Sequence, residues 1–280
     1  MSPIHDQGYR RYGGQRTPPG HAWSVIAKAG IRTLISKRTF IGLLLLAWLP
    51  FIVRTVQIYA ATSLPQASFL APDAQMFRQF LQQQEVFLFF ITVYVGAGLI
   101  ATDRRANALQ IYLSKPLSRL EYIFGKLTIL AAFLLFVTWL PAVLLLFIQI
   151  MFSGSFKFFV DNLFLFPAIT IFSFIQVIAV ASAMLALSSL SNSSRYVGVL
   201  YTGVLFFSQA LYGIVYAITR DSRFGVIAPA IALNRLGDAI FSSPTRVQLS
   251  VAASAVAVAV LILVSVLILE KRVRGVEVVA

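Results

Sequence analysis

Charged side chains in this sequence gather in a short polar segment, 102–126, that lies between two long apolar stretches. Its only acids, Asp103 and Glu121, are separated in the chain and have no histidine nearby, so they do not suggest an acid/base pair for catalysis. The segment is better suited to contact with a partner protein, where exposed ion pairs contribute about 0–1 kcal/mol each and an apolar face contributes more. The residues predicted to make such contacts are Asp103, Arg104, Arg105, Leu109, Tyr112, Lys115, Arg119 and Glu121.

Other residue types needed for common chemistry are missing. The chain has no cysteine, which excludes a thiol nucleophile, iron–sulfur ligation and thiolate zinc, and its two histidines lie in the polar N-terminal tail. Gly125-Lys126 lacks the upstream glycine of a phosphate-binding loop, because position 120 is Leu. No His-Glu-x-x-His or Gly-x-Ser-x-Gly motif occurs. We therefore expect no catalytic, cofactor-binding or metal-binding residue in this chain, and any energy for work to come from another chain.

The composition indicates a membrane protein. The 280 residues are 59% hydrophobic and 12% charged, with a mean hydropathy of +0.83, whereas soluble domains are typically about 45–50% apolar and about 25% charged. The net charge of +13 favours an anionic lipid surface over nucleic acid, because the basic residues are spread over several short loops. Six segments are long enough to span a bilayer as helices, at about 39–60, 85–101, 127–152, 163–189, 196–218 and 248–269.

The segment before the first span has two parts. Residues 1–21 are rich in Gly, Pro, Gln and Arg and are predicted to be a flexible tail. Residues 22–37 place Trp23 and other apolar residues at helical steps with basic residues around them, which predicts a helix in the membrane interface, with a helix in water as the alternative. The predicted fold is an all-α polytopic membrane protein whose single transmembrane domain covers 22–280. Kinks are expected at Pro141 and Pro167.

The distribution of charge predicts an orientation. With six spans, 16 of the 23 Lys and Arg residues lie on the side of both termini, so both termini are expected in the cytoplasm of a cell whose inner (plasma) membrane holds the protein. The basic residues of 102–126 then have a second interpretation, that they only enforce this orientation. Glu85 is the only acid within the spans and lies at an outer edge, which disfavours an ion-driven carrier. Arg54 either extends to the outer headgroups or lines a cavity for an anionic substrate.

Local signals place several elements. Ala108, Leu109, Tyr112 and Leu113 share one helical face, Pro116 breaks the helix, and Ser118 with Glu121 fits a capping box. The segment that begins Pro229-Ala-Ile-Ala-Leu-Asn-Arg-Leu has apolar residues at near-helical steps, which fits a re-entrant or surface helix, or a packed loop. Small residues, among them Gly96 and Gly98, offer surfaces for assembly with a second copy.

The run LQIYLSKPLSRLEYIFGKL, together with the six spans and the segment from Pro229, resembles the permease subunit of the ABC type-2 transporter family. Asp103 departs from the Glu that is common there, and Ala108 from a common Gly-Thr. The resemblance implies a type V-like exporter fold and a pairing with a second permease copy or a homologous permease. It also implies that ATP and Mg are bound by a separate ABC ATPase, the nucleotide-binding subunit, which docks on the 102–126 coupling loop.

Two other classes of function stay open at this point. The first is a non-transporting membrane scaffold or a subunit that transmits force to partners. The second, which the motifs support less, is an integral-membrane enzyme. The few charges in the spans suit a lipid-like or amphipathic cargo, although apolar walls are also the default of any helical bundle.

Overall fold

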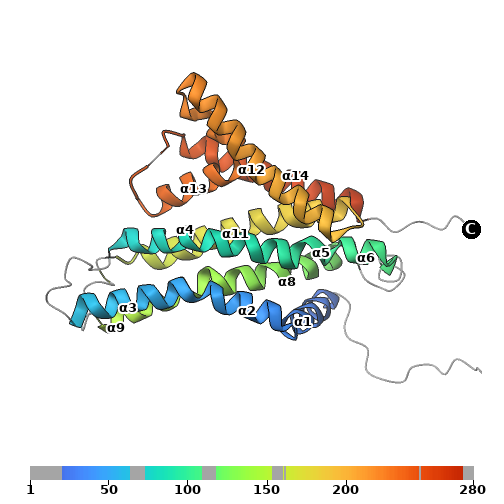
Figure 1. Ribbon diagram of the computed structural model, residues 1–280, viewed down its shortest axis with the longest axis horizontal. Helices are drawn as coiled ribbons and strands as arrows, with labels where there is room; N and C mark the ends of the chain where they lie inside the picture. Colours follow the sequence, from blue (N-terminus) through green and yellow to red (C-terminus); the bar gives the residue numbers. More distant parts are fainter. Residues whose placement is uncertain are drawn as a thin grey trace, which may run out of the picture.

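A computed structural model describes residues 21–63, 73–108, 118–152, 160, 162–245 and 247–273. The regular elements within these ranges are all helical, and the bundle they form is elongated (Figure 1). Six helices are long and apolar enough to cross a membrane, which confirms the predicted all-α class and the predicted number of spans. They are Arg38–Ser63, Ala74–Arg105, Arg119–Phe152, Leu165–Leu190, Ser194–Thr219 and Val251–Arg272.

The first three of these six spans consist of more than one helical segment, and the last three are single helices. A π-helical turn, Thr92–Gly96, joins α4 to α5, and a 3-10 turn, Ser222–Ile227, precedes α13. The α-helices in chain order are α1 (Ala22–Ile35), α2 (Arg38–Ala47), α3 (Leu49–Ser63), α4 (Ala74–Ile91), α5 (Ala97–Leu99), α6 (Ala101–Arg105), α8 (Arg119–Val137), α9 (Trp139–Phe152), α11 (Leu165–Leu190), α12 (Ser194–Thr219), α13 (Pro229–Ile240) and α14 (Val251–Arg272).

The first helix, α1, packs against α8 and is seen nearly end-on in Figure 1, so it runs across the bundle. Two glycines allow the close approach. A Cβ atom on Gly30 would lie 2.2 Å from Ile129 Cδ1, and one on Gly125 would lie 3.0 Å from the carbonyl oxygen of Trp23. The helix expected here is present, while its place on the membrane surface stays a prediction.

Proline explains two of the breaks. The α2–α3 break at Trp48 precedes Pro50, and the α8–α9 break at Thr138 precedes Pro141, because proline donates no hydrogen bond and its ring crowds the carbonyl four residues earlier. The kink predicted at Pro141 is therefore confirmed. Pro167 behaves differently, since it lies in the first turn of α11, where its missing N–H leaves no helical bond unmade. The kink predicted at Pro167 is wrong.

The second span begins at Ala74, before the start predicted near Glu85. Asp73 caps α4 by accepting a hydrogen bond from the Met76 N–H at 2.9 Å. Phe77, Phe80 and Leu81 are fully buried and carry the apolar face of α4 through a glutamine-rich stretch. As a result, Glu85 lies within a long helix rather than at its edge.

Gly96 ends the π-helical turn and is packed inside the protomer. A Cβ atom there would lie 2.4 Å from Met184 Cγ on α11 and 3.0 Å from Leu130 Cδ2 on α8. Gly96 thus brings three helices of the same chain together, and the expectation that it offers a surface to a second copy is wrong.

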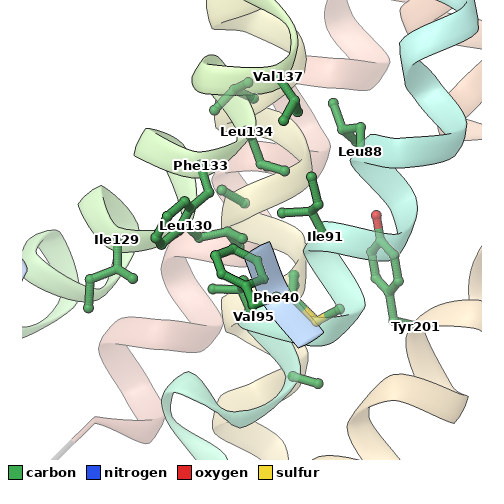
Figure 2. Close-up of a cluster of buried hydrophobic side chains, with 14 of the residues drawn as sticks. Phe40, Leu88, Ile91, Val95, Ile129, Leu130, Phe133, Leu134, Val137 and Tyr201 are labelled. Carbon is green, nitrogen blue, oxygen red and sulfur yellow. The ribbon is translucent and has the colours of Figure 1, made fainter. Parts of the chain in front are cut away.

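The main core lies where α2, α4, α8, α11 and α12 meet, and Figure 2 shows its side chains. Phe40 is fully buried, with its ring edge-on to Phe133 at 4.7 Å and stacked on Tyr94 at 5.4 Å. Lipid tails are as apolar as these side chains, so close packing, rather than removal of apolar surface from water, holds such a core together.

The segment from Pro229 forms a helix, α13, which packs against α14, α11 and α12. Pro229 occupies its first turn, where proline is favoured, and Leu233 and Leu236 are buried. Figure 1 shows α12 diverging from the other long helices, with α13 lying between it and the α4–α11 pair. The predicted helix is confirmed, and the alternative of a loop is excluded.

Candidate functional site

The described ends of the 102–126 segment are fastened to each other by one carboxylate. Asp103 Oδ2 on α6 accepts a hydrogen bond from the Tyr122 hydroxyl at 2.7 Å and lies 2.7 Å from Lys126 Nζ. Tyr122 and Lys126 are one turn apart on α8, so both point to the same side. Their side chains are almost completely buried. The ion pair therefore joins the end of the second span to the start of the third.

A second set of contacts joins the same place to α11. Ser188 Oγ accepts hydrogen bonds from the backbone N–H groups of Ile100 and Ala101, both at 3.1 Å, and donates one to the Ala97 carbonyl at 2.9 Å. Arg104 donates from Nη1 to the carbonyl oxygen of Ser189. The backbone groups left open by the irregular α5–α6 junction are thus satisfied by α11, and three spans are joined at one place. We call the residues Asp103, Arg104, Tyr122, Lys126 and Ser188 the loop base.

The start of α8 has the predicted capping box. Ser118 Oγ accepts from the Glu121 N–H at 3.2 Å, and Glu121 Oε2 accepts from the Ser118 N–H at 2.9 Å. Glu121 therefore holds the helix end, whereas Arg119 beside it is exposed. Arg105 is also exposed at the other end of the segment.

Of the eight residues predicted to contact a partner, three described ones have internal bonds, namely Asp103, Arg104 and Glu121. Two described ones, Arg105 and Arg119, are exposed. Leu109, Tyr112 and Lys115, with the short helix predicted around them, lie outside the described residues. The role of all eight in docking stays a prediction.

Sequence reasoning missed an apolar surface next to these residues. Leu120 and Phe124 on α8 are 72% and 52% exposed, one turn apart, and the Phe124 ring lies edge-on to Trp23 of α1 at 5.1 Å. Together with Ile123 they line a shallow groove between α1 and α8. The sequence signal that could have indicated this surface is the four-residue spacing of Leu120 and Phe124 at the start of the capped helix.

Arg54 lies on α3 and donates from Nη1 to Gln57 Oε1 at 2.8 Å, one turn along the same helix. It is half-buried. It does not line the large cavity between α4, α11, α12, α13 and α14. A role for Arg54 in a cavity shared with a second subunit stays a prediction.

A buried polar network at the far end of the bundle was also missed. Arg78 on α4 is 2% exposed and donates from Nε to Asp238 Oδ1 at 3.0 Å. Its Nη2 donates to the carbonyl and side-chain oxygens of Asn234 at 2.9 and 2.7 Å, and its guanidinium lies 4.9 Å from the centre of the Phe172 ring. Because Arg78 and the segment from Pro229 were both predicted to lie outside the spans, their pairing was not foreseen.

The spacing held a signal for this network. Asn234 and Asp238 are one turn apart on α13, and Arg78 and Glu85 are two turns apart on α4, so each pair shares a helix face. The network fixes α13 to the second span. Among the described residues, no group of three or more His, Asp or Glu side chains could hold a metal ion.

Comparison with known proteins gives one family. A family model described as ABC-2 family transporter protein matches residues 24–270, which include both the loop base and the Arg78 network. No curated protein matches the chain.

Proposed function

The chain belongs to the ABC-2 family of transporter proteins, and from that premise we propose that it exports its cargo with energy from a separate ATPase that docks on the 102–126 coupling loop. As a multi-pass member of this family, it is the permease, or membrane component, of an ABC transporter. The direction of transport and the docking surface are the proposed parts.

The loop base is the observation that carries the proposal. A coupling element must pass motion of a soluble ATPase to the spans without absorbing it. The Asp103–Lys126 pair and the Ser188 bonds tie α6, α8 and α11 together at one place. Buried charge pairs with complete hydrogen bonding resist separation, because a lone buried charge is costly. A push on the loop therefore moves three spans as one body, whereas a simple connecting loop needs no such anchorage.

The proposed contact surface combines charge with apolar area. Arg105 and Arg119 are exposed at the two described ends of the loop, where they would meet acids of the ATPase. The apolar contact comes from Leu109 and Tyr112, and from exposed Leu120, eight positions after Tyr112 in the sequence. Exposed ion pairs contribute little on their own, so we expect the apolar side chains to supply most of the affinity.

The complete transporter would contain two permease chains, either two copies of this one or one copy with a homologous permease, and two ATPase subunits. ATP and Mg would be bound by the ATPase alone. In this arrangement both termini and the coupling loop face the cytoplasm, and α13 faces the outside of the plasma membrane.

Purification of the tagged chain from its native membrane, followed by identification of every co-purifying subunit, tests the proposal. We expect an ATPase with a phosphate-binding loop in equal amount to the permease chains. A stable complex that lacks any ATPase would instead support the alternative of a membrane scaffold or force-transmitting subunit.

A further inference from the structure

The bundle contains a cavity that the proposed coupling does not use. It has a volume of about 280 Å³ and lies between α4, α11, α12, α13 and α14. Most of its wall is apolar, with Leu88, Val180, Leu205 and Leu233 among the lining residues. Tyr201 lines it too, and Figure 2 shows Tyr201 at the margin of the main core, on the side away from the α8 residues. Pockets that bind small molecules have this apolar character and begin at about this size.

Two acceptor groups interrupt the apolar wall. Gln176 is 3% exposed, and its Oε1 atom is buried without a hydrogen-bond partner among the described residues. Glu85 also lines the cavity, and its Oε2 accepts a long bond of 3.3 Å from Asn234 Nδ2. A buried acceptor without a donor costs free energy, and a ligand that brings a donor or a positive charge recovers it.

The charge balance around Glu85 favours a cation. The Arg78 guanidinium, two turns before Glu85 on α4, directs its Nε to Asp238 and its Nη2 to Asn234. With both carboxylates ionised, the network of Arg78, Asp238 and Glu85 carries one excess negative charge. That charge borders an apolar space, where electrostatic attraction is much stronger than in water.

Two aromatic rings complete the site. Phe89 follows Glu85 by one helical turn on α4 and lines the same cavity. Its ring is stacked on that of Tyr201 with centroids 6.1 Å apart. Aromatic faces attract ammonium groups, and the combination of a carboxylate with aromatic rings is how proteins recognise hydrophobic amines and quaternary ammonium ions.

We propose that this cavity binds an amphipathic monocation, an amine or quaternary ammonium whose charged group lies at Glu85 and whose apolar body fills the space between α11, α12 and α14. Binding is a property of this chain and needs no ATPase. Only the further step, that such a cation is the exported cargo, rests on the proposed function.

Matched probes of opposite charge test the proposal. The full-length chain, purified in a non-ionic detergent, is titrated with decyltrimethylammonium or with decanoate, and the bound molecules are counted by native mass spectrometry. We expect one decyltrimethylammonium per chain at saturation and at least about tenfold weaker binding of decanoate, because one probe meets an attractive charge and the other a repulsive one. Equal binding of the two probes would show a site for lipid tails and overturn the proposal, and so would no binding of either.

Three variants locate the binding. Glu85→Gln should weaken decyltrimethylammonium binding about ten- to hundredfold, whereas Glu270→Gln, which removes an exposed acid at the end of α14, should leave it unchanged. Ala183→Trp fills the cavity from α11 and should abolish binding with Glu85 intact. Unchanged affinity in a folded Glu85→Gln or Ala183→Trp chain would overturn the proposal. Circular dichroism checks that each variant is folded. If a variant does not fold, the comparison of decyltrimethylammonium with decanoate on the wild-type chain still tests whether the cavity prefers a cation.

Discussion

Lys126 Nζ lies 2.7 Å from Asp103 Oδ2, and this pair closes the base of a loop whose two ends belong to different membrane spans. Both side chains are largely shielded from solvent, and the same carboxylate oxygen also accepts the Tyr122 hydroxyl. The pair is therefore a structural fastener, and the charges available to a partner are those farther out on the loop.

The fastener gives a first prediction, on stability. Asp103→Asn should lower the free energy of unfolding by about 1.5–3 kcal/mol, because Lys126 would be left buried without its counter-charge. Adding Lys126→Met should recover part of this loss, since no lone charge then remains. Thermal unfolding of the purified chains measures both. Additive losses in the double variant would show that the pair does not interact, and Arg105→Gln is the exposed control.

A second prediction concerns the contact between α4 and α13. A Cβ atom on Gly237 would lie 2.7 Å from Arg78 Cζ, so Gly237→Ala should displace the buried guanidinium and cost about 1–3 kcal/mol of stability. Gly213→Ala is the matched control on α12, where a Cβ atom meets nothing within 4 Å. That change should be neutral or stabilise by up to about 1 kcal/mol, because alanine favours helix. The same thermal assay compares them, and equal stability of the two variants would contradict the packing described here.

Orientation gives a third prediction. The chain contains no cysteine, so single cysteines can be labelled without background. Ser242→Cys, after α13, should react with a membrane-impermeant maleimide in intact cells, and Arg119→Cys, at the start of α8, should react only after the membrane is opened. Both side chains are exposed, and Arg119 is replaced in preference to Ser118 because Ser118 caps α8. Labelling of Arg119→Cys in intact cells would reverse the proposed orientation.

The sequence predicts well what depends on neighbouring residues. Long apolar runs predicted six spans, the Ser118–Glu121 spacing predicted a capping box, and Pro141 predicted a break. Prediction from sequence fails where polar residues that are distant in the chain form hydrogen bonds and ion pairs with one another. Arg78 and Asp238 are 160 positions apart, and each alone resembles an ordinary loop charge. Their pairing allows both side chains to be buried. Because Arg78 is buried, α4 can extend back to Ala74, and Glu85 then lies within the helix and beside the cavity.

The candidate site likewise has one part that could be predicted from the sequence and one part that could not. Charge clustering in 102–126 drew attention to a segment whose two described ends have structured contacts, while its role in docking stays a prediction. The internal bond of Arg104 depends on α11, whose Ser189 carries no distinctive pattern in the sequence. The exposed Leu120 and Phe124 were overlooked because their four-residue spacing also fits residues that face the core of a bundle.

The coupling role of the 102–126 loop is tested most directly by ATPase binding to loop variants. Leu109→Asp combined with Tyr112→Asp places two charges on the apolar face expected to dock, and Arg105→Ala serves as a mild control. We expect the double variant to insert normally into the membrane, to retain less than about a tenth of the ATPase in pull-down and to lose cargo-stimulated ATP hydrolysis. Arg105→Ala should lower ATPase binding by less than about fivefold. Undiminished ATPase binding by the double variant would contradict the claim that the 102–126 loop couples ATP hydrolysis to the spans.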